Sequence, residues 1–285
     1  MAPRESASEG RAAALPASDR VAELQARLLA WYSANGRDLP WRRTNDPYAV
    51  LVSEVMLQQT QVSRVVPRFE AFLRLFPSLE ALADRPLADV LRSWRGLGYN
   101  NRAERLWRCA CASVAQRAPG RPVSLPDTLD GLLALPGIGP YTARAVLVFA
   151  YDADLAAVDA NVRRVLTHEL DLAPDLGPPA LQAVADAVLP RGRSRDWHNA
   201  LMDYGSLVLT ARATGIAPRT RQSAFEGSRR WYRSRLLRTL LDEGPQGVVG
   251  LAERLQADAT FVDDLCRALE RDGLVSRRDG RVVVA

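Results

Sequence analysis

The sequence predicts a mainly α-helical protein of two or three lobes whose C-terminal end has a different pattern. The 285 residues include 47% hydrophobic and 25% charged residues, an ordinary balance for a globular protein with a sizeable core. Apolar residues recur at helical spacing along most of the chain. From Trp231 onward, three helical segments near 232–242, 248–255 and 260–271 precede two short strands around Asp279-Gly280, which is typical of a winged helix.

The charged residues and cysteines restrict the chemistry. The net charge is +5, and all 38 basic residues are arginine, so no lysine amine is available to form a Schiff base. A basic protein of this kind suits a polyanionic partner. Cys109, Cys111 and Cys266 have the spacing of neither a disulfide framework nor a metal site, and we expect core thiols in a reducing compartment. Neither a signal sequence nor an apolar run long enough to cross a membrane is present, which predicts a cytoplasmic protein.

The first predicted helix follows a polar tail and leads to a loop that contains an indole. Apolar residues keep helical spacing from Asp19 until Asn35-Gly36. Trp41 then lies among arginines in the loop of residues 37–43. Its ring can anchor the core or stack on a base, and the residues alone favour the core.

Glu54 lies in a helix predicted from Tyr48 to about Val66, with a further helix from Pro67 to Leu75. The positions three and four residues away from Glu54 are largely apolar, so its carboxyl group shares an apolar face. Such surroundings raise the pKa of a carboxyl group and suit a general acid. The alternative is a Glu54 side chain that points to solvent at the edge of this face.

Two glycine turns stand out in the middle of the chain. Gly96-Leu97-Gly98-Tyr99 presents an aromatic ring beside polar residues. Leu135-Pro136-Gly137-Ile138-Gly139-Pro140 predicts a helix, a tight turn and a second helix, with Asp127 capping the first helix. Glycines at 137 and 139 permit positive φ and close backbone approach, so the turn can hold a phosphate or form a plain corner.

Asp159 immediately precedes a predicted helix, where capping the helix N-terminus is the commonest role of aspartate. Helices near 180–189 and 196–209 complete this part, and residues 210–221 are expected to form a loop. Winged helices bind DNA or other proteins, so the C-terminal region alone sets no function.

Between residues 22 and 209, five motifs in matching order resemble the helix-hairpin-helix DNA glycosylase superfamily, and most closely its MutY family of adenine DNA glycosylases. The motifs are Arg37-Asp38-Leu39-Pro40-Trp41, Ser53-Glu54-Val55-Met56-Leu57-Gln58-Gln59-Thr60-Gln61-Val62, Gly96-Leu97-Gly98-Tyr99, Leu135-Pro136-Gly137-Ile138-Gly139 and Val158-Asp159-Ala160-Asn161-Val162.

The resemblance implies a two-lobed helix-hairpin-helix DNA glycosylase fold with the active site between the lobes, followed by a winged-helix-like domain. The expected organisation is a disordered tail over 1–18, the glycosylase domain over 19–228 and the winged-helix-like domain over 229–285. The implied substrate is adenine mispaired with 8-oxoguanine or guanine in double-stranded DNA, flipped out of the stack. We expect a monomer, associated with the bacterial nucleoid.

The family pattern also implies roles for individual residues. Breaking the glycosidic bond of a purine calls for an acid and a carboxylate that stabilises the sugar cation. Glu54 would be the acid and Asp159 the carboxylate, with Tyr141 and Asn161 beside them. The adenine pocket would include Arg37, Trp41 and Asp203. The residues expected to contact DNA, with Gln59 and Tyr99 filling or wedging the space around the flipped base, are Gln58, Gln59, Tyr99, Gly137, Ile138, Gly139 and Thr142.

Position 141 separates two reaction types. Lyase members of the superfamily have their Schiff-base lysine here, and this chain has a tyrosine. We therefore expect a monofunctional, metal-independent glycosylase that leaves the abasic strand uncut. Related thymine or uracil mismatch glycosylases can also have tyrosine at this position, so removal of T or U opposite G is an alternative. A regulatory DNA-binding protein derived from a glycosylase is another.

The chain departs from the family after its last catalytic helix. Most members have four cysteines there that hold an iron–sulfur cluster, whereas residues 209–221 contain none. We therefore expect no iron–sulfur cofactor, and Arg212, Arg219 and Arg221 either contact phosphates or face solvent. A monovalent cation at the hairpin carbonyls is compatible with the family pattern. We also expect the short winged-helix pattern in place of the large C-terminal domain that recognises 8-oxoguanine in other members.

Overall fold

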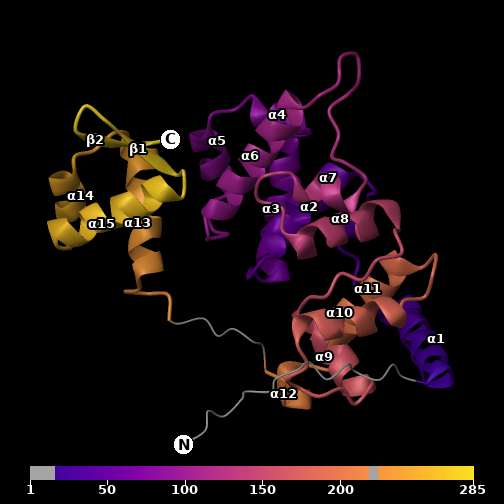
Figure 1. Cartoon of the computed structure of the whole chain (residues 1–285). Helices are drawn as coiled ribbons and strands as arrows, with labels where there is room; N and C mark the ends of the chain where they lie inside the picture. The colour runs from indigo at the N-terminus through magenta and orange to yellow at the C-terminus, as the bar shows by residue number, and fades with distance from the viewer. Residues whose placement is uncertain (1–16, 218–223) are drawn as a thin grey trace, which may run out of the picture. The chain divides into compact units, whose positions relative to one another are not determined.

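The computed structural model of the protein describes residues 17–217 and 224–285 (Figure 1). The chain forms two compact units, one from Met1–Asp38 with Leu147–Thr220 and one from Leu39–Val146 with Arg221–Ala285. Residues 1–16 of the expected tail lie outside the described residues, and Ser18 already begins the first helix. Within the described residues, no helix has both the length and the apolar character that crossing a membrane requires.

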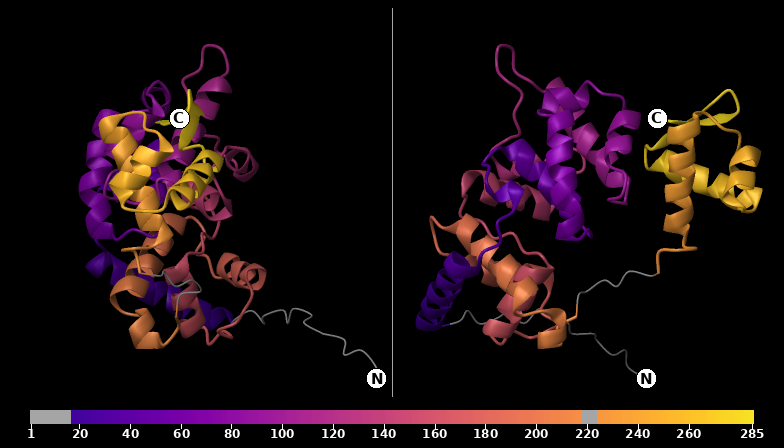
Figure 2. Two further views of the ribbon diagram at one scale, coloured as in Figure 1. Left: turned by 90° about the vertical axis from the view of Figure 1, so that its left-hand side faces the viewer. Right: turned by 180° about the vertical axis from the view of Figure 1, so that it is seen from behind.

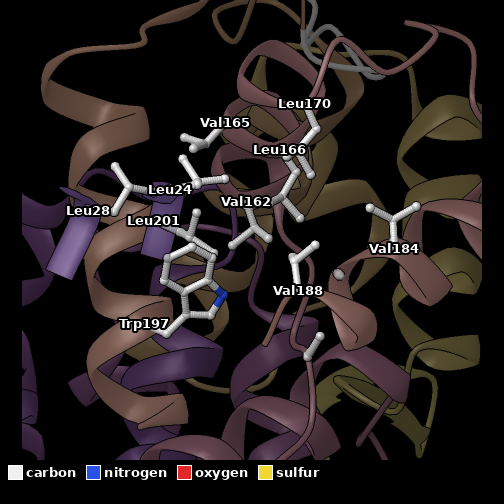
Figure 3. Packing of buried hydrophobic residues seen from close by; sticks show 12 residues of the cluster. Leu24, Leu28, Val162, Val165, Leu166, Leu170, Val184, Val188, Trp197 and Leu201 are labelled. Atoms are coloured by element: carbon white, nitrogen blue, oxygen red, sulfur yellow. The ribbon is translucent and has the colours of Figure 1, made fainter. Parts of the chain in front are cut away.

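The first unit consists of helices that pack around one apolar core. Its elements are α1 (Ser18–Asn35), the end of α8 (Pro140–Tyr151), α9 (Ala160–Glu169), α10 (Pro178–Ala187), α11 (Ser194–Leu207) and α12 (Ala211–Thr214). Leu28 of α1, Val162 of α9 and Trp197 of α11 meet in the interior, each 1% exposed or less (Figure 3). The core therefore joins the N-terminal helix to segments more than 130 residues away, and it fixes the start of α9.

The helical part of the second unit packs around large aromatic residues. Its elements are the 3₁₀ turn η1 (Pro40–Arg42), α2 (Pro47–Leu57), α3 (Val62–Leu75), α4 (Leu79–Ala83), α5 (Leu87–Ser93), α6 (Asn101–Ala115), α7 (Leu129–Leu133) and the start of α8. Trp94 and Phe72 pack edge to face with ring centroids 5.8 Å apart, and both are buried. Asp46 and Ser78 cap α2 and α4 through their side-chain oxygens.

Three predictions of local structure need correction. The helix expected over 48–66 is two helices, because the chain turns at residues 58–61 and Gln59 has φ 55°. Pro67 consequently lies inside α3 rather than at the start of a helix. Thr128, not Asp127, caps α7 by accepting from the N–H of Gly131. The loop expected after α11 contains the short helix α12, while Arg219 and Arg221 lie outside the described residues.

The C-terminal end of the second unit has the predicted winged-helix pattern. Helices α13 (Arg229–Glu243), α14 (Val248–Leu255) and α15 (Ala259–Arg271) are followed by β1 (Val275–Arg278) and β2 (Arg281–Val284). The same helices and hairpin lie together in each view of Figure 2. The strands pair antiparallel, with Arg278 opposite Arg281, and Asp279 and Gly280 both have positive φ. This two-residue turn matches the twist of the hairpin, as the Asp-Gly pair predicts.

Candidate active site

Glu54 lies on a helix whose surface is almost entirely buried. Residues 48–56 of α2 are all buried, and Glu54 is 7% exposed. The alternative of a solvent-facing Glu54 side chain is therefore wrong. A carboxyl group enclosed in this way is available to a substrate only inside a pocket, which is where a general acid works.

Arg102 of α6 holds the C-terminal end of α2 next to Glu54. The guanidinium group donates to six oxygens and so satisfies carbonyls that the end of a helix leaves unpaired. Burial lowers the pKa of Arg102 to about 10, which leaves the group charged at neutral pH. The acceptors, at 2.5–3.1 Å, are the carbonyl oxygens of Val55, Met56, Gln58, Leu97 and Gly98 and the hydroxyl of Thr60.

The structure brings Gln58 to the predicted hairpin. Its amide nitrogen donates to the hydroxyl of Thr142 at 3.4 Å, and both residues line a cavity of about 200 Å³ together with Gly137, Ile138 and Gly139. Five of the residues expected to contact DNA therefore surround one hollow in the second unit. Gln59, the next residue, is exposed beside it.

The backbone conformation and the surroundings differ between the two hairpin glycines. Gly137 has φ 82°, and a Cβ at this position would lie 2.6 Å from the Cβ of Arg105, so both the backbone conformation and the packing require glycine. Gly139 does not use the positive φ that glycine permits. A Cβ at Gly139 would meet no atom of the described residues within 4 Å. Its absent side chain leaves room for a ligand to approach the backbone. Tyr141 follows in the first turn of α8 and is half-buried.

Asp159 caps α9, as predicted, and both of its carboxylate oxygens accept hydrogen bonds. Oδ1 accepts from the N–H of Val162 at 2.7 Å, and Oδ2 accepts from the side-chain amide of Asn161 at 2.9 Å. Burial raises the pKa of Asp159, while the two donors and the nearby Arg164 favour the charged form. The two hydrogen bonds thus fix the orientation of the carboxylate. Burial disfavours its charged form, and the hydrogen bonds favour it.

Asn161 is itself oriented by Arg164. The guanidinium group donates to Asn161 Oδ1 and to the carbonyl oxygen of Gly205, both at 2.5 Å. Because Asn161 Oδ1 is the acceptor for Arg164, its Nδ2 points to Asp159. A Cβ at Gly205 would lie 2.9 Å from the Cβ of Asn161, so glycine allows α11 to pack closely on α9. Arg164 also donates to the carbonyl of Leu209, which ties the segment after α11 to the same network.

The half-buried Arg37 and the buried Asp203 form an ion pair in the first unit. Asp203 is fully buried, and its Oδ1 accepts from Arg37 Nε at 2.7 Å while Oδ2 accepts from the Arg37 backbone N–H at 2.8 Å. The predicted pocket residues at 37 and 203 therefore lie together. Trp41 belongs to the second unit, is 8% exposed and packs edge to face on Phe69 with centroids 5.6 Å apart.

Each unit carries a separate set of the predicted residues. The first unit holds Arg37, Asp159, Asn161 and Asp203, and the second holds Trp41, Glu54, Gln58, Gln59, Tyr99, Gly137, Ile138, Gly139, Tyr141 and Thr142.

Comparison with known proteins identifies the family. Residues 52–175 match the model of the HhH-GPD superfamily base excision DNA repair protein. The adenine DNA glycosylase of Mycolicibacterium smegmatis is 39% identical over 286 residues, which cover 90% of this chain and 94% of that protein. The chain belongs to the adenine DNA glycosylase family.

Solved structures of other DNA glycosylases resemble this member of the adenine DNA glycosylase family in fold. A thermostable thymine-DNA glycosylase matches with a TM-score of 0.62 and 28% identity, over 69% of this chain and 90% of the other. A trapped endonuclease III–DNA covalent intermediate matches with a TM-score of 0.61 and 18% identity, over 71% of this chain and 91% of the other. These likenesses confirm the predicted helix-hairpin-helix glycosylase fold.

The cysteines of this adenine DNA glycosylase family member do not fit an iron–sulfur cluster. Such a cluster needs four thiolates, and the chain has three cysteines. Cys109 and Cys266 are buried on α6 and α15, where burial raises the pKa of their thiols to about 12 and about 11. Among residues 17–217 and 224–285, no group of three or more His, Cys, Asp or Glu side chains could hold a metal ion.

Sequence reasoning missed two arginines that position the site of this family member. Arg102 and Arg164 both follow motif residues, Gly98-Tyr99 and Asp159-Ala160-Asn161, by three positions, which is one helical turn. That spacing is a signal that a helical arginine can reach back to the preceding turn. It could not indicate which carbonyl groups the guanidinium would find.

Proposed function

We propose that the protein is a monofunctional adenine DNA glycosylase, which hydrolyses the bond between adenine and deoxyribose where adenine is mispaired with 8-oxoguanine or guanine. It acts as a monomer on double-stranded DNA and uses neither a metal ion nor an iron–sulfur cluster. The observation that carries the proposal is the Asp159 carboxylate, which two hydrogen-bond donors hold at the start of α9. Support also comes from the relatives in the same family, whose name describes this activity.

The proposed reaction uses the two carboxyl groups in different protonation states. The Glu54 acid transfers its proton to a ring nitrogen of the flipped adenine, and the electron pair of the glycosidic bond leaves with the base. The Asp159 carboxylate stabilises the resulting sugar cation electrostatically. Water then attacks the sugar carbon and returns a proton to Glu54. The products are free adenine and an abasic site.

The hairpin supplies the grip on DNA in this proposal. The backbone around Gly139 is open to a ligand, and the N–H groups at the start of α8 are typical partners for a phosphate oxygen. Arginines near it, such as Arg105 of α6, add positive charge. Such contacts hold the backbone of DNA without reading its sequence.

A second candidate is removal of thymine from a mismatch with guanine. The observation that favours it is the structural likeness to the thermostable thymine-DNA glycosylase at 28% identity. Protonation by a buried carboxylic acid helps a purine leave more than it helps thymine, because adenine in DNA has basic ring nitrogens that can accept the proton and thymine has none. We therefore rank adenine first.

A base-release assay decides between these candidates. Duplexes contain A opposite 8-oxoguanine, A opposite G, T opposite G or U opposite G, and release is measured under single-turnover conditions. We expect release of adenine from the first two only, and Glu54→Gln should lower the rate by at least about 100-fold because the acid is lost. The matched control is Glu70→Gln, the same chemical change at an exposed position of α3, which should leave the rate unchanged.

Three results would contradict the proposal. Release of T or U without release of A would favour the second candidate. An intact protein that releases no base from any duplex would support a regulatory DNA-binding protein instead. Cleavage of the abasic strand that persists after the α-amino group is blocked would exclude the monofunctional reaction, because the chain has no lysine to supply an amine.

A further inference from the structure

Tyr99, the expected wedge residue, lies in a turn of unusual backbone conformation. Tyr99 has φ 48° and follows Gly98 with φ 73°. A non-glycine residue in this region costs about 1–2 kcal/mol and persists only where its surroundings fix it. Arg102 is one such restraint, since its guanidinium carbon lies 5.6 Å from the centroid of the Tyr99 ring and its nitrogen donates to the Gly98 carbonyl.

A second restraint on Tyr99 comes from the C-terminal region of the chain. Arg230 of α13, 131 residues further along, donates from its guanidinium group to the Tyr99 hydroxyl at 2.5 Å. The guanidinium carbon of Arg230 also lies 5.6 Å from the centroid of the Tyr99 ring. One cation thus engages both the polar end and the π-system of the same side chain.

Contacts near the other end of α13 keep this helix in place within the second unit. Arg92 of α5 donates to the carbonyl of Leu241 at 3.2 Å, and Arg95 forms an ion pair with Asp242. The first turn and the last turns of α13 are therefore both tied to residues 92–99. These contacts of α13 with residues 92–99 determine where the helix places Arg230.

We propose that Arg230 is a positioning residue through which the winged-helix region holds Tyr99 ready to enter DNA at a mispair. The inference rests on the proposed function, which makes Tyr99 the residue that wedges the duplex. A ring held in one orientation loses little conformational entropy when it inserts between bases, so the gain appears as affinity for the deformed duplex.

Equilibrium binding of the full chain to two duplexes tests this inference. One duplex contains A opposite 8-oxoguanine and the other is fully paired, and the ratio of their dissociation constants is the mispair preference. All proteins carry Glu54→Gln, so that the base stays attached during the measurement. We expect Arg230→Ala to lower the mispair preference about tenfold and Arg230→Lys, which keeps a cation, to restore part of it. Arg238→Ala, at an exposed position of α13, is the matched control and should change it less than about twofold.

A double-mutant cycle links the effect to Tyr99. In a Tyr99→Ala background, Arg230→Ala should change the mispair preference less than about twofold, because the side chain that it positions is gone. Tyr99→Phe removes only the hydroxyl that accepts from Arg230, so it should lower the preference about threefold without disturbing the fold. Thermal unfolding of each variant shows whether the winged-helix region remains folded.

The outcomes separate the inference from the proposed function. Equal effects of Arg230→Ala with and without Tyr99, or a change no larger than that of Arg238→Ala, would overturn the positioning role. A parent protein that binds both duplexes equally would also overturn it, because Tyr99 would then recognise nothing. If the protein prefers the mispair but releases no base from it, the proposed function fails while the binding cycle still decides the role of Arg230.

Discussion

At the scale of single residues, the proposed reaction requires the Asp159 carboxylate to stay ionised although burial raises its pKa. Asn161 and the N–H of Val162 donate to the charged form and resist that shift. A carboxyl group with a raised pKa loses its charge at a higher pH than usual as the solution is acidified. The rate of adenine release should therefore fall on the acid side of neutrality, at a pH above the ordinary range for aspartate.

Asn161→Ala should move this acid limb to higher pH. The change removes a donor to the carboxylate, which raises the pKa of Asp159 further and lowers the fraction of the active form. Below neutral pH we expect a rate about tenfold lower than that of the unchanged protein, with a smaller difference at high pH. Single-turnover rates between pH 5 and 9 measure it. Asn35→Ala, at the exposed end of α1, is the control, and an acid limb that does not move would refute the role of Asn161.

At the scale of elements, one arginine determines where α2 ends. No glycine or proline interrupts residues 48–66, and the sequence predicts an uninterrupted helix over this range. The actual end depends on Arg102, a residue more than 40 positions away, which donates to the carbonyl oxygens of Val55, Met56 and Gln58. Local periodicity carries no information about such a partner.

Arg102→Met should test how much this attachment contributes. The substitution keeps an apolar stem of similar length but leaves several buried carbonyls without a donor, each of which costs about 1–3 kcal/mol. We expect the free energy of unfolding to fall by about 3 kcal/mol or more, as measured by urea denaturation. Arg85→Met, at an exposed position, should change it by less than about 0.5 kcal/mol. A similar small change for Arg102→Met would mean that water satisfies the freed carbonyls.

Elements with purely local signals were predicted from the sequence. The Asp279-Gly280 hairpin and the cap at Asp159 both depend on residues within three positions of each other, and the structure confirms them. The cap of α7 was misplaced by one residue, since Asp127 and Thr128 are equally suitable capping residues. The candidate site residues are predicted from the order of the family motifs and not from the local periodicity of apolar residues. Arg230 has no motif around it, so only the folded chain reveals its contact with Tyr99.

At the scale of the whole molecule, the winged-helix region is attached to α6 of the same compact unit as well as to the turn at Tyr99. Gly273 has φ 70°, and a Cβ built on it would lie 2.9 Å from Oε1 of Glu104. Glu104 is 3% exposed, and burial raises the pKa of its carboxyl group. A methyl group at position 273 would therefore force the Glu104 carboxylate to shift within its buried surroundings.

Two glycine substitutions separate this contact from backbone strain. Gly273→Ala and Gly280→Ala place a Cβ at nearly the same φ, 70° and 73°, but a Cβ at Gly280 would meet no atom of the described residues within 4 Å. Both should lower the free energy of unfolding by about 1 kcal/mol from strain, and Gly273→Ala should cost about 1 kcal/mol more through its clash with Glu104. Only Gly273→Ala should also lower the mispair preference, because it loosens the attachment that brings Arg230 to Tyr99. Equal losses of stability and equal mispair preferences in the two variants would show that the winged-helix region does not depend on this contact.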